Sequence, residues 1–298
     1  MKLGFIGLGR MGFNMILNLH SKKIDVVAYN RSIEPINKIK KYGVETASLI
    51  DSLIDKLPER KIIWLMVTAG KPVDSVIKEL LPYLKKDDII IDGGNSFYKD
   101  SIKRYNYLKK KKIHFVDIGT SGGLEGARHG ACLTIGGDKK IFKKIEPICR
   151  AVSAKNGYAH VGGAGAGHFV KMVHNGIEYA LLQAYGDGFE LLFKGPYKLD
   201  LRKVAETWQN GSVIRSWLLE LAADAFKKYP YLKKIKGIVG GGETGQWAID
   251  TAREYAISAE SIKLALKLRK KSKKQPTFAG KVIAALRNEF GGHEVVRK

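Results

Sequence analysis

Four polar side chains recur at helical spacing in one segment of the chain. Lys171, His174, Asn175 and Glu178 occupy offsets 0, 3, 4 and 7 within residues 165–179. A helix turns by about 100° per residue, so the other three side chains each lie within about 60° of Lys171, on one stripe. A lysine can accept a proton and a glutamic acid can deliver one. The stripe is therefore a candidate for acid–base catalysis.

The faces beside this stripe are apolar. They carry Phe169, Val170, Met172, Val173, Ile177, Ala180, Leu181 and Leu182. Because a helix that is apolar over most of its circumference is normally buried, we expect this helix to lie inside the protein. A buried ion pair between Lys171 and Glu178 that holds two helices together is the alternative interpretation, since buried charges are costly unless paired.

The composition indicates a globular protein of two domains. Its 298 residues exceed what one compact core usually holds, and 45% of them are hydrophobic against 27% charged. No apolar stretch reaches the length of a membrane span. Residues 1–3 lead directly into a strand pattern without the features of a signal peptide, so we expect a cytoplasmic protein.

The chain is strongly basic. Its 52 lysines and arginines outnumber 29 acidic residues, a net charge of +23. The excess gathers in runs at Lys38–Lys41, Lys109–Lys112, Lys139–Lys144 and Arg269–Lys274. Nucleic acid is a possible partner for such a charge, but these runs lack interleaved aromatic residues and any recognised nucleic-acid module. A solvated lysine-rich surface, which would also attract small phosphorylated ligands, is the favoured interpretation.

Two cysteines, Cys132 and Cys149, have neither pairing nor metal-ligand spacing around them. We expect both to be buried thiols. No cluster of metal-ligand residues is evident in the sequence, so no metal site is expected.

Strand and helix patterns alternate over the first 160 residues and then give way to helices. Apolar runs predict strands at Lys2–Leu8, Val26–Tyr29, Ile62–Val67, Asp88–Asp92, His114–Ile118 and Ala131–Gly136, with helices between them. Glycines at 162–167 mark a break, beyond which helical patterns cover about 167–193, 201–210, 216–229, 244–256, 258–269 and 277–290. The predicted fold class is α/β plus all-α: a Rossmann-type doubly wound sheet over residues 1–163 and a helical domain over residues 164–298.

A glycine fingerprint follows the first predicted strand and opens a helix. Its members are Gly7, Leu8, Gly9, Arg10, Met11 and Gly12. Gly7 permits a tight turn, Gly9 lets a pyrophosphate approach the backbone, and Gly12 lets helix and strand pack closely. This context favours dinucleotide binding over a chance glycine turn.

The residues after the second predicted strand bear on the choice of cofactor. An NAD site usually has a carboxylate there, which accepts a hydrogen bond from the ribose 2′-hydroxyl and would repel a 2′-phosphate. This chain has Asn30, Arg31 and Ser32 instead. NADP is therefore favoured and NAD remains possible. The alternative is an exposed Arg31 that contacts only solvent.

Three further segments have a composition suited to ligand binding. Residues 92–96, including Asn95, and residues 121–128, including Ser121, Gly122 and Gly123, follow predicted strands at the ligand-binding edge of the sheet. The alternative is that they are simple turns, with Asp92 as an anchor. Near the C-terminus, Arg287 precedes His293 across a glycine bend and could hold a phosphate. The alternative interpretation is that this segment is a C-terminal tail with a frayed helix end.

Taken together, these motifs resemble the short form of the 6-phosphogluconate dehydrogenase family. The resemblance runs from Gly4 to about His293. It is carried by the glycine loop and by Val67–Gly70, Ile91–Ser96, Gly119–Arg128, Gly165–Tyr179 and Leu286–His293.

The resemblance implies oxidative decarboxylation of 6-phospho-D-gluconate to D-ribulose 5-phosphate and CO2, a step of the pentose phosphate pathway, with reduction of a nicotinamide cofactor. It implies that Lys171 is the general base and Glu178 the acid that protonates the enediol. Burial would favour the uncharged forms of both groups. The residues that it assigns to the sugar acid are Asn95, Ser121, Gly122, Gly123, His174, Asn175 and Tyr179, and those for the phosphate are Arg269, Arg287 and His293.

The same resemblance implies an oligomer and a wider cofactor site. Arg287 and His293 are expected to reach in from another subunit of a homodimer or homotetramer. Val67, Thr68, Ala69 and Asn95 are expected to join the glycine loop in binding the cofactor. Longer members of the family have a lysine in the loop where this chain has Gly240–Glu243, a lysine in place of Thr68, and a second helical repeat.

Two other functions remain open from the sequence. A β-hydroxyacid dehydrogenase of the 3-hydroxyisobutyrate or tartronate-semialdehyde type shares the fold, the lysine and the asparagine four residues later. Glu178, the loop at 92–96 and the basic C-terminus favour the decarboxylating reaction. The other alternative is a nucleic-acid-binding protein that retains an inactive dehydrogenase fold, against which the intact catalytic stripe argues.

Overall fold

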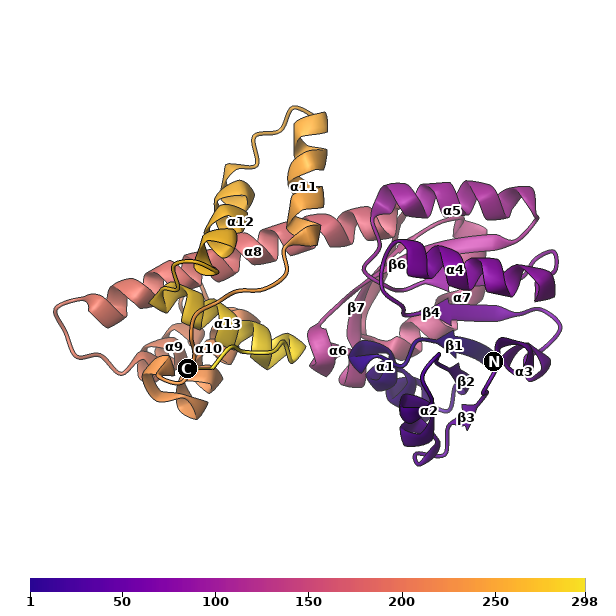
Figure 1. Cartoon of the computed structure of the whole chain (residues 1–298), viewed down its shortest axis with the longest axis horizontal. Helices are drawn as coiled ribbons and strands as arrows, with labels where there is room; N and C mark the ends of the chain where they lie inside the picture. The colour runs from indigo at the N-terminus through magenta and orange to yellow at the C-terminus, as the bar shows by residue number, and fades with distance from the viewer. Residues whose placement is uncertain (298) are drawn as a thin grey trace. The chain divides into compact units, whose positions relative to one another are not determined.

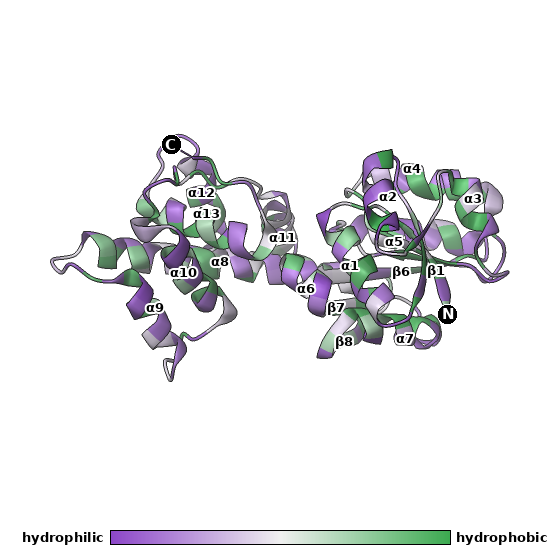
Figure 2. Cartoon of the chain, turned by 90° about the horizontal axis from the view of Figure 1, so that it is seen from below, coloured by the Kyte–Doolittle hydropathy of each residue, from purple (hydrophilic) through white to green (hydrophobic). Residues whose placement is uncertain are grey.

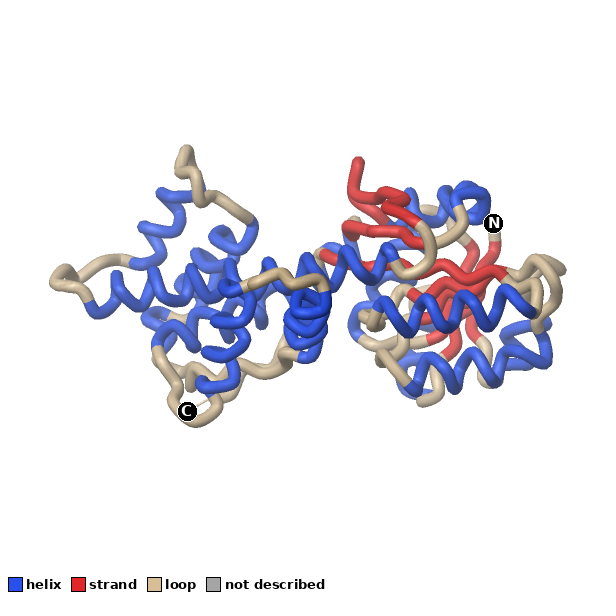
Figure 3. The backbone as a smooth tube through the Cα atoms, turned by 90° about the horizontal axis from the view of Figure 1, so that it is seen from above, coloured by secondary structure: helices blue, strands red, loops and turns tan. Residues whose placement is uncertain are grey.

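The computed structural model describes residues 1–297 and divides the chain into two compact units, Met1–Lys171 and Met172–Lys298. The boundary falls inside one long helix, α8 (Ala166–Lys194). The strands belong to the first unit and the second is built from helices, as Figure 3 shows. The predicted α/β plus all-α class is therefore confirmed.

The first unit contains one sheet of eight strands in the order β3-β2-β1-β4-β5-β6-β7-β8. Their bounds are β1 Lys2–Ile6, β2 Asp25–Tyr29, β3 Glu45–Thr46, β4 Ile62–Leu65, β5 Ile89–Asp92, β6 His114–Ser121, β7 Ala131–Gly136 and β8 Ser153–Gly162. All neighbours are parallel except β6 and β7. The order of β1 to β6 is that of a Rossmann fold, in which the sequence order reverses between β1 and β4.

Helices cover both faces of this sheet (Figure 1). Their bounds are α1 Arg10–Ser21, α2 Ile33–Lys40, α3 Ile50–Asp55, α4 Lys71–Leu80, the 3-10 turn η1 Leu81–Tyr83, α5 Tyr98–Lys110, α6 Gly123–His129 and α7 Lys139–Val152. Side chains of α1 and α7 pack in one core, and those of α3, α4 and α5 in the other. Two-sided burial explains why β4 and β5 are continuous apolar runs.

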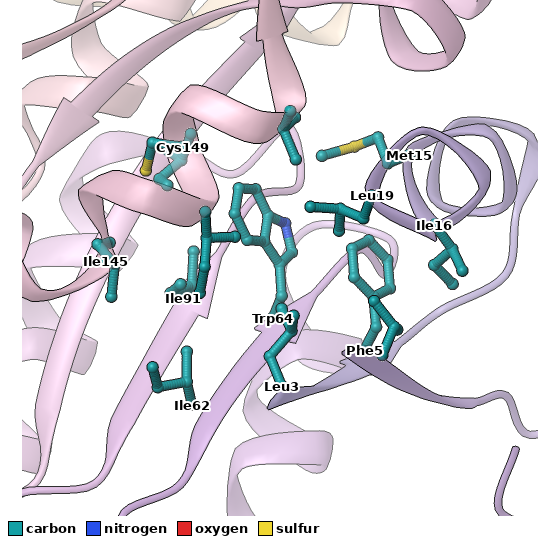
Figure 4. Close-up of a cluster of buried hydrophobic side chains, with 14 of the residues drawn as sticks. Leu3, Phe5, Met15, Ile16, Leu19, Ile62, Trp64, Ile91, Ile145 and Cys149 are labelled. Atoms are coloured by element: carbon teal, nitrogen blue, oxygen red, sulfur yellow. The ribbon is translucent and has the colours of Figure 1, made fainter. Parts of the chain in front are cut away.

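Trp64 and Phe5 are the largest fully buried side chains of the first core (Figure 4). Their rings are nearly parallel, with centroids 6.1 Å apart. Their neighbours on the same strands, Ile63 and Ile6, point into the other core. This alternation keeps the strand ends, and therefore the loops that follow them, in register.

Two strands and one α-helix were not predicted from the sequence. β3 has two residues, too few for a recognisable pattern. α6 begins at Gly123 behind the left-handed Gly122, and its glycines indicated a loop. β8 is an edge strand with mostly polar or exposed residues. The expectation that both cysteines are buried is wrong for Cys132, whose side chain alternates outward on β7, and holds for Cys149.

Over residues 172–297, the second unit contains the rest of α8, five further α-helices and one 3-10 turn. Their bounds are α9 Leu201–Gln209, α10 Trp217–Lys228, the 3-10 turn η2 Pro230–Leu232, α11 Glu243–Glu254, α12 Glu260–Ser272 and α13 Phe278–Gly291. Asp200, Ser216 and Thr277 cap α9, α10 and α13 by accepting a hydrogen bond from an amide of the first turn. Figure 2 shows hydrophobic (green) and hydrophilic (purple) residues alternating along these helices, as is typical of amphipathic helices.

The expectation that α8 is buried is wrong for the single chain. Val173, Ile177, Leu181 and Leu191 are 38%, 52%, 46% and 74% exposed. The opposite face, with Leu182 and Phe189, is buried in the helical core. Sequence periodicity could not separate a helix surrounded by its own chain from one with an apolar face left open. Among residues 1–297, no helix is long and apolar enough to cross a membrane.

Candidate active site

The glycine loop lies between β1 and α1. Gly7 has φ of 106°, and a Cβ there would lie 2.4 Å from the carbonyl oxygen of Met66. A Cβ on Gly12 would lie 2.1 Å from the carbonyl oxygen of Gly7, so this glycine lets α1 pack on the turn. Gly9, the residue before α1, has open space around its Cβ position. The backbone amides that begin α1 are accessible to a phosphate at this point.

Asn30 lies after β2 and stabilises the glycine loop. Its Oδ1 accepts a hydrogen bond from the amide of Leu8 at 3.0 Å, and its Nδ2 donates to the carbonyl of Ser32 at 3.1 Å. The side chain of Arg31 is exposed. Asn30 therefore supports the loop, while Arg31 is a cation available at the end of β2.

The loops after β4 and β5 lie beside each other in the sheet order. The first contains Val67, Thr68 and Ala69, and the second leads through two glycines to the exposed Asn95. Asp92 at the end of β5 is fully buried and accepts hydrogen bonds from the amide of Gly94 and the hydroxyl of Ser96. Asp92 thus anchors the loop that presents Asn95.

Lys171 and Ser121 are brought together from positions far apart in the sequence. The Nζ of Lys171 donates to the Oγ of Ser121 at 2.7 Å, where β6 ends. Lys171 is half-buried rather than buried. Gly122 and Gly123, both at positive φ, follow Ser121 and begin α6.

The first turn of α8 is held against β6 and β7 by several contacts. Asp117, fully buried in β6, accepts hydrogen bonds from the amides of Gly165 and His168 at 2.7 and 2.9 Å. Thr134 of β7 donates to the carbonyl of Gly167 at 2.9 Å. These contacts determine where Lys171, one turn further along α8, emerges. Sequence reasoning missed Asp117, although a charged residue inside an apolar strand is a signal for it.

Four more of the predicted site residues belong to α8 within the helical unit. His174 is exposed and its Nδ1 lies 3.2 Å from the Oδ1 of Asn175. Glu178 and Tyr179 are half-buried. A Cβ on Gly245 of α11 would lie 2.6 Å from the Tyr179 ring, so glycine is required for that ring to occupy its place.

Two arginines converge near Tyr179. Arg269 of α12 is 4% exposed, and its guanidinium carbon lies 3.6 Å from the centroid of the Tyr179 ring. Within residues 1–297, its Nη1 is buried without a hydrogen-bond partner. Burial lowers the pKa of Arg287, and the charge of Arg269 lowers it further, while Tyr179, Glu178 and Glu243 act in the opposite direction. The cluster is suited to receive an anion.

Arg287 lies beside a glycine-rich loop of its own chain. Its Nη2 lies 3.3 Å from the Cβ position of Gly241, in the loop that lacks the lysine of longer relatives. Arg287 thus shares its environment with Arg269 of the same chain. The ring of His293 packs edge-on against Phe290, with the ring centroids 6.2 Å apart. Among residues 1–297, no group of three or more His, Cys, Asp or Glu side chains could hold a metal ion.

Both units match models of known protein families. The profile of the NAD binding domain of 6-phosphogluconate dehydrogenase matches residues 2–162, and that of the 6-phosphogluconate dehydrogenase C-terminal domain matches residues 167–278. A Haloferax volcanii protein named 6-phosphogluconate dehydrogenase, NAD(+)-dependent, decarboxylating is 43% identical, over 100% of this chain and 99% of that protein. A Saccharomyces cerevisiae protein named 6-phosphogluconate dehydrogenase, decarboxylating 1 is 39% identical, over 87% of this chain and 57% of the length of that protein.

Solved structures agree with this relationship. Plasmodium falciparum 6-phosphogluconate dehydrogenase has a TM-score of 0.83 and 32% identity, and the match covers 91% of this chain and 62% of that one. Mycobacterium tuberculosis 3-hydroxyisobutyrate dehydrogenase, at 19% identity and a TM-score of 0.75 over 96% of this chain and 99% of that one, shares the fold alone. The chain belongs to the 6-phosphogluconate dehydrogenase family.

Proposed function

We propose that Lys171 and Glu178 carry out the reaction of this family, in which 6-phospho-D-gluconate is oxidised and decarboxylated to D-ribulose 5-phosphate and CO2. A nicotinamide dinucleotide, held at the glycine loop, supplies the hydride acceptor when bound. The observation that carries the proposal is the 2.7 Å bond between Lys171 Nζ and Ser121 Oγ, because it holds the amine at the carboxyl edge of the sheet, where open α/β folds bind ligands.

The steps follow from the positions of these groups. The unprotonated amine of Lys171 takes the proton of the substrate 3-hydroxyl as hydride leaves carbon 3. The β-keto acid that results loses carbon 1 as CO2, and the enediolate left across carbons 2 and 3 takes its proton back from Lys171. Glu178, seven residues further along α8, then donates a proton to the former carbon 2, which becomes carbon 1 of the ketose, while Lys171 accepts the proton of the hydroxyl on the former carbon 3. Asn95, Ser121, Gly122, Gly123, His174, Asn175 and Tyr179 are the proposed ligands of the sugar acid.

Replacement of Lys171 by methionine tests this assignment. Loss of a positioned general base costs about a hundred- to ten-thousandfold in rate. Lys171→Met should therefore lose turnover by that factor and still bind 6-phosphogluconate in calorimetry. A folded variant with parental turnover would rule out Lys171 as the base. Release of CO2 by the parent, followed together with reduction of the cofactor, distinguishes this function from that of a β-hydroxyacid dehydrogenase.

We further propose that Arg269 and Arg287 of one chain hold the substrate phosphate together. Support comes from the buried Arg269 and from the mutual repulsion of two desolvated cations, which a bound phosphate would relieve. Arg287→Ala should raise KM for 6-phosphogluconate more than it lowers kcat. Mixed oligomers of Arg287→Ala and Lys171→Met subunits test whether Arg287 acts in its own subunit or in a neighbouring one. They regain activity only if the Arg287 of a Lys171→Met subunit completes the site of an Arg287→Ala subunit. His293 remains a proposed contribution to a neighbouring subunit.

The proposed cofactor preference is NADP over NAD, with Arg31 and Ser32 beside the 2′-phosphate. Arg31 is an exposed cation at the end of β2, and no carboxylate occupies residues 29–32. Arg31→Ala should weaken NADP use about ten- to a hundredfold, as loss of a charge-assisted hydrogen bond does, and leave NAD use nearly unchanged. The ratio of kcat/KM for the two cofactors at constant ionic strength is the measurement. Equal weakening of both would contradict the proposal.

The exposed face of α8 supports a homodimer. Val173, Ile177 and Leu181 succeed one another at intervals of four residues, and Leu191 extends the row. A continuous apolar row of this kind on a helix is normally covered. A second copy of α8 would cover it. Ile177→Asp should convert the dimer to monomer in light scattering, whereas an unchanged mass would exclude this face.

A further inference from the structure

Arg104 of α5 is a buried cation that no motif of the sequence singled out. Its side chain is 5% exposed. Nε donates to Asp74 Oδ1 at 2.7 Å, Nη1 donates to Asp92 Oδ2 at 3.3 Å, and Nη2 donates to the carbonyl of Gly70 at 3.0 Å. Nη1 also lies 3.4 Å from Ser96 Oγ. The three nitrogens thus contact two different segments of the chain.

These segments are the two loops at the ends of β4 and β5. Gly70 ends the loop that contains Val67–Ala69 and has φ of 82°, and Asp74 lies in the first turn of α4 that follows. Asp92 and Ser96 flank the loop that presents Asn95. Arg104 therefore links the loop after β4 to the loop after β5 through one guanidinium.

The sheet order indicates which part of a dinucleotide these loops face. A Rossmann domain binds a dinucleotide across the point where strand order reverses, one half of the ligand to each half of the sheet. Here that point lies between β1 and β4. The glycine loop and Arg31 follow β1 and β2 and serve the adenosine half. The loops that Arg104 joins follow β4 and β5 and lie on the nicotinamide side.

The chemistry of the network requires arginine. A guanidinium presents donors in a fixed planar fork, whereas an ammonium is a single point on a flexible stem. A lysine could neutralise the buried Asp92 but could not hold Asp74, Asp92 and the Gly70 carbonyl at once. Charge balance and loop geometry can therefore be separated by substitution at this one position.

We propose that Arg104 is a positioning residue for the nicotinamide half of the cofactor. It acts by holding the loops after β4 and β5 in one geometry and makes no contact with the ligand itself. This inference rests on the proposed function only in taking a nicotinamide dinucleotide as the ligand.

Arg104→Lys is the primary test, read by calorimetric titration with NADP, NAD and the fragments 2′,5′-ADP and 5′-AMP. We expect the dissociation constants of both dinucleotides to rise about ten- to a hundredfold, the scale of lost charge-assisted hydrogen bonds. The fragments, held only on the adenosine side, should bind as to the parent. A folded variant with unchanged dinucleotide affinity would overturn the proposal, and so would equal weakening of dinucleotides and fragments.

Two further variants keep the result interpretable. Lys103→Arg is the matched control, because it makes the reverse exchange on the neighbouring, 78% exposed side chain of the same helix and should change none of the affinities. The double change Arg104→Met with Asp92→Asn removes both buried charges together and replaces Arg104→Lys if that variant does not fold. A parent that binds neither dinucleotide would refute the proposed function instead, which separates the two failures.

Discussion

Replacement of Gly119 by alanine should slow turnover without unfolding the protein. Gly119 lies in β6 where α8 crosses it. A Cβ there would lie 2.4 Å from the Cβ of Lys171 and 2.6 Å from Thr134 Oγ1. Since non-bonded carbons pack about 3.5–4.0 Å apart, the first turns of α8 must withdraw by about an ångström.

The size of the effect follows from this displacement. Overpacking of a buried site costs about 1–3 kcal/mol in the free energy of unfolding. A withdrawal of about 1 Å moves the Nζ of Lys171 away from Ser121 and from any substrate hydroxyl, and misplacement on that scale costs about a hundredfold in rate. We therefore expect kcat to fall about a hundredfold in a variant that remains folded.

The assay measures kcat from cofactor reduction at saturating substrate, with thermal unfolding recorded on the same sample. Gly163→Ala is the matched control, because Gly163 is exposed and has nothing within 4 Å of its Cβ position. That variant should keep parental kcat and stability. A folded Gly119→Ala enzyme with parental kcat would refute the argument that this glycine determines the position of Lys171.

Three other predictions concern the acid, the hydroxyl beside the base and the thiols. Glu178→Gln should form the ketone and lose CO2 but release product at least a hundredfold more slowly than the parent, since the enediol lacks its acid. Quenched-flow measurement of the rate of product release tests this, and a rate equal to that of the parent would exclude Glu178 as the acid. Ser121→Ala should lower kcat about ten- to a hundredfold through loss of the 2.7 Å bond to Lys171, and recovery in Ser121→Thr would show that the hydroxyl is responsible. Burial raises the pKa of Cys149 from 9.0 to about 12, so the native thiol holds its proton; this contribution to stability is present below pH 9 and lost as pH rises towards 12. Iodoacetamide at pH 8 should therefore label Cys132 alone in the native protein and both thiols after unfolding. Labelling of Cys149 in the native protein would contradict this prediction.

The order and type of most elements could be predicted from the sequence because local signals determine them. Apolar runs such as residues 62–65 are continuous because both faces of the sheet are covered, and the glycines at 7, 9 and 12 stand where a tight turn must open a helix. The candidate site followed in outline from helical spacing and from the family motifs. β3 and β8 were missed because a two-residue strand and a polar edge strand have no pattern of their own.

Contacts between distant residues were decided by the tertiary structure alone. Ser121 meets Lys171 across 50 positions of sequence, and Asp117 reaches the first turn of α8 across 48. Spacing along the chain says nothing about such pairs, because they depend on how β6 and α8 pack. The same reason kept Arg104 hidden within a lysine-rich helix.

Burial also depended on tertiary packing. The sequence alone determined that α8 is an apolar helix with a polar stripe, and it predicted a buried one. The structure leaves Val173, Ile177 and Leu181 exposed and brings Arg287 beside Arg269 in one chain. The hydrophobic pattern predicts only that an apolar face is covered, because the hydrophobic effect depends on the area removed from water and not on which surface covers it. Which surface does so is decided by the arrangement of the helices.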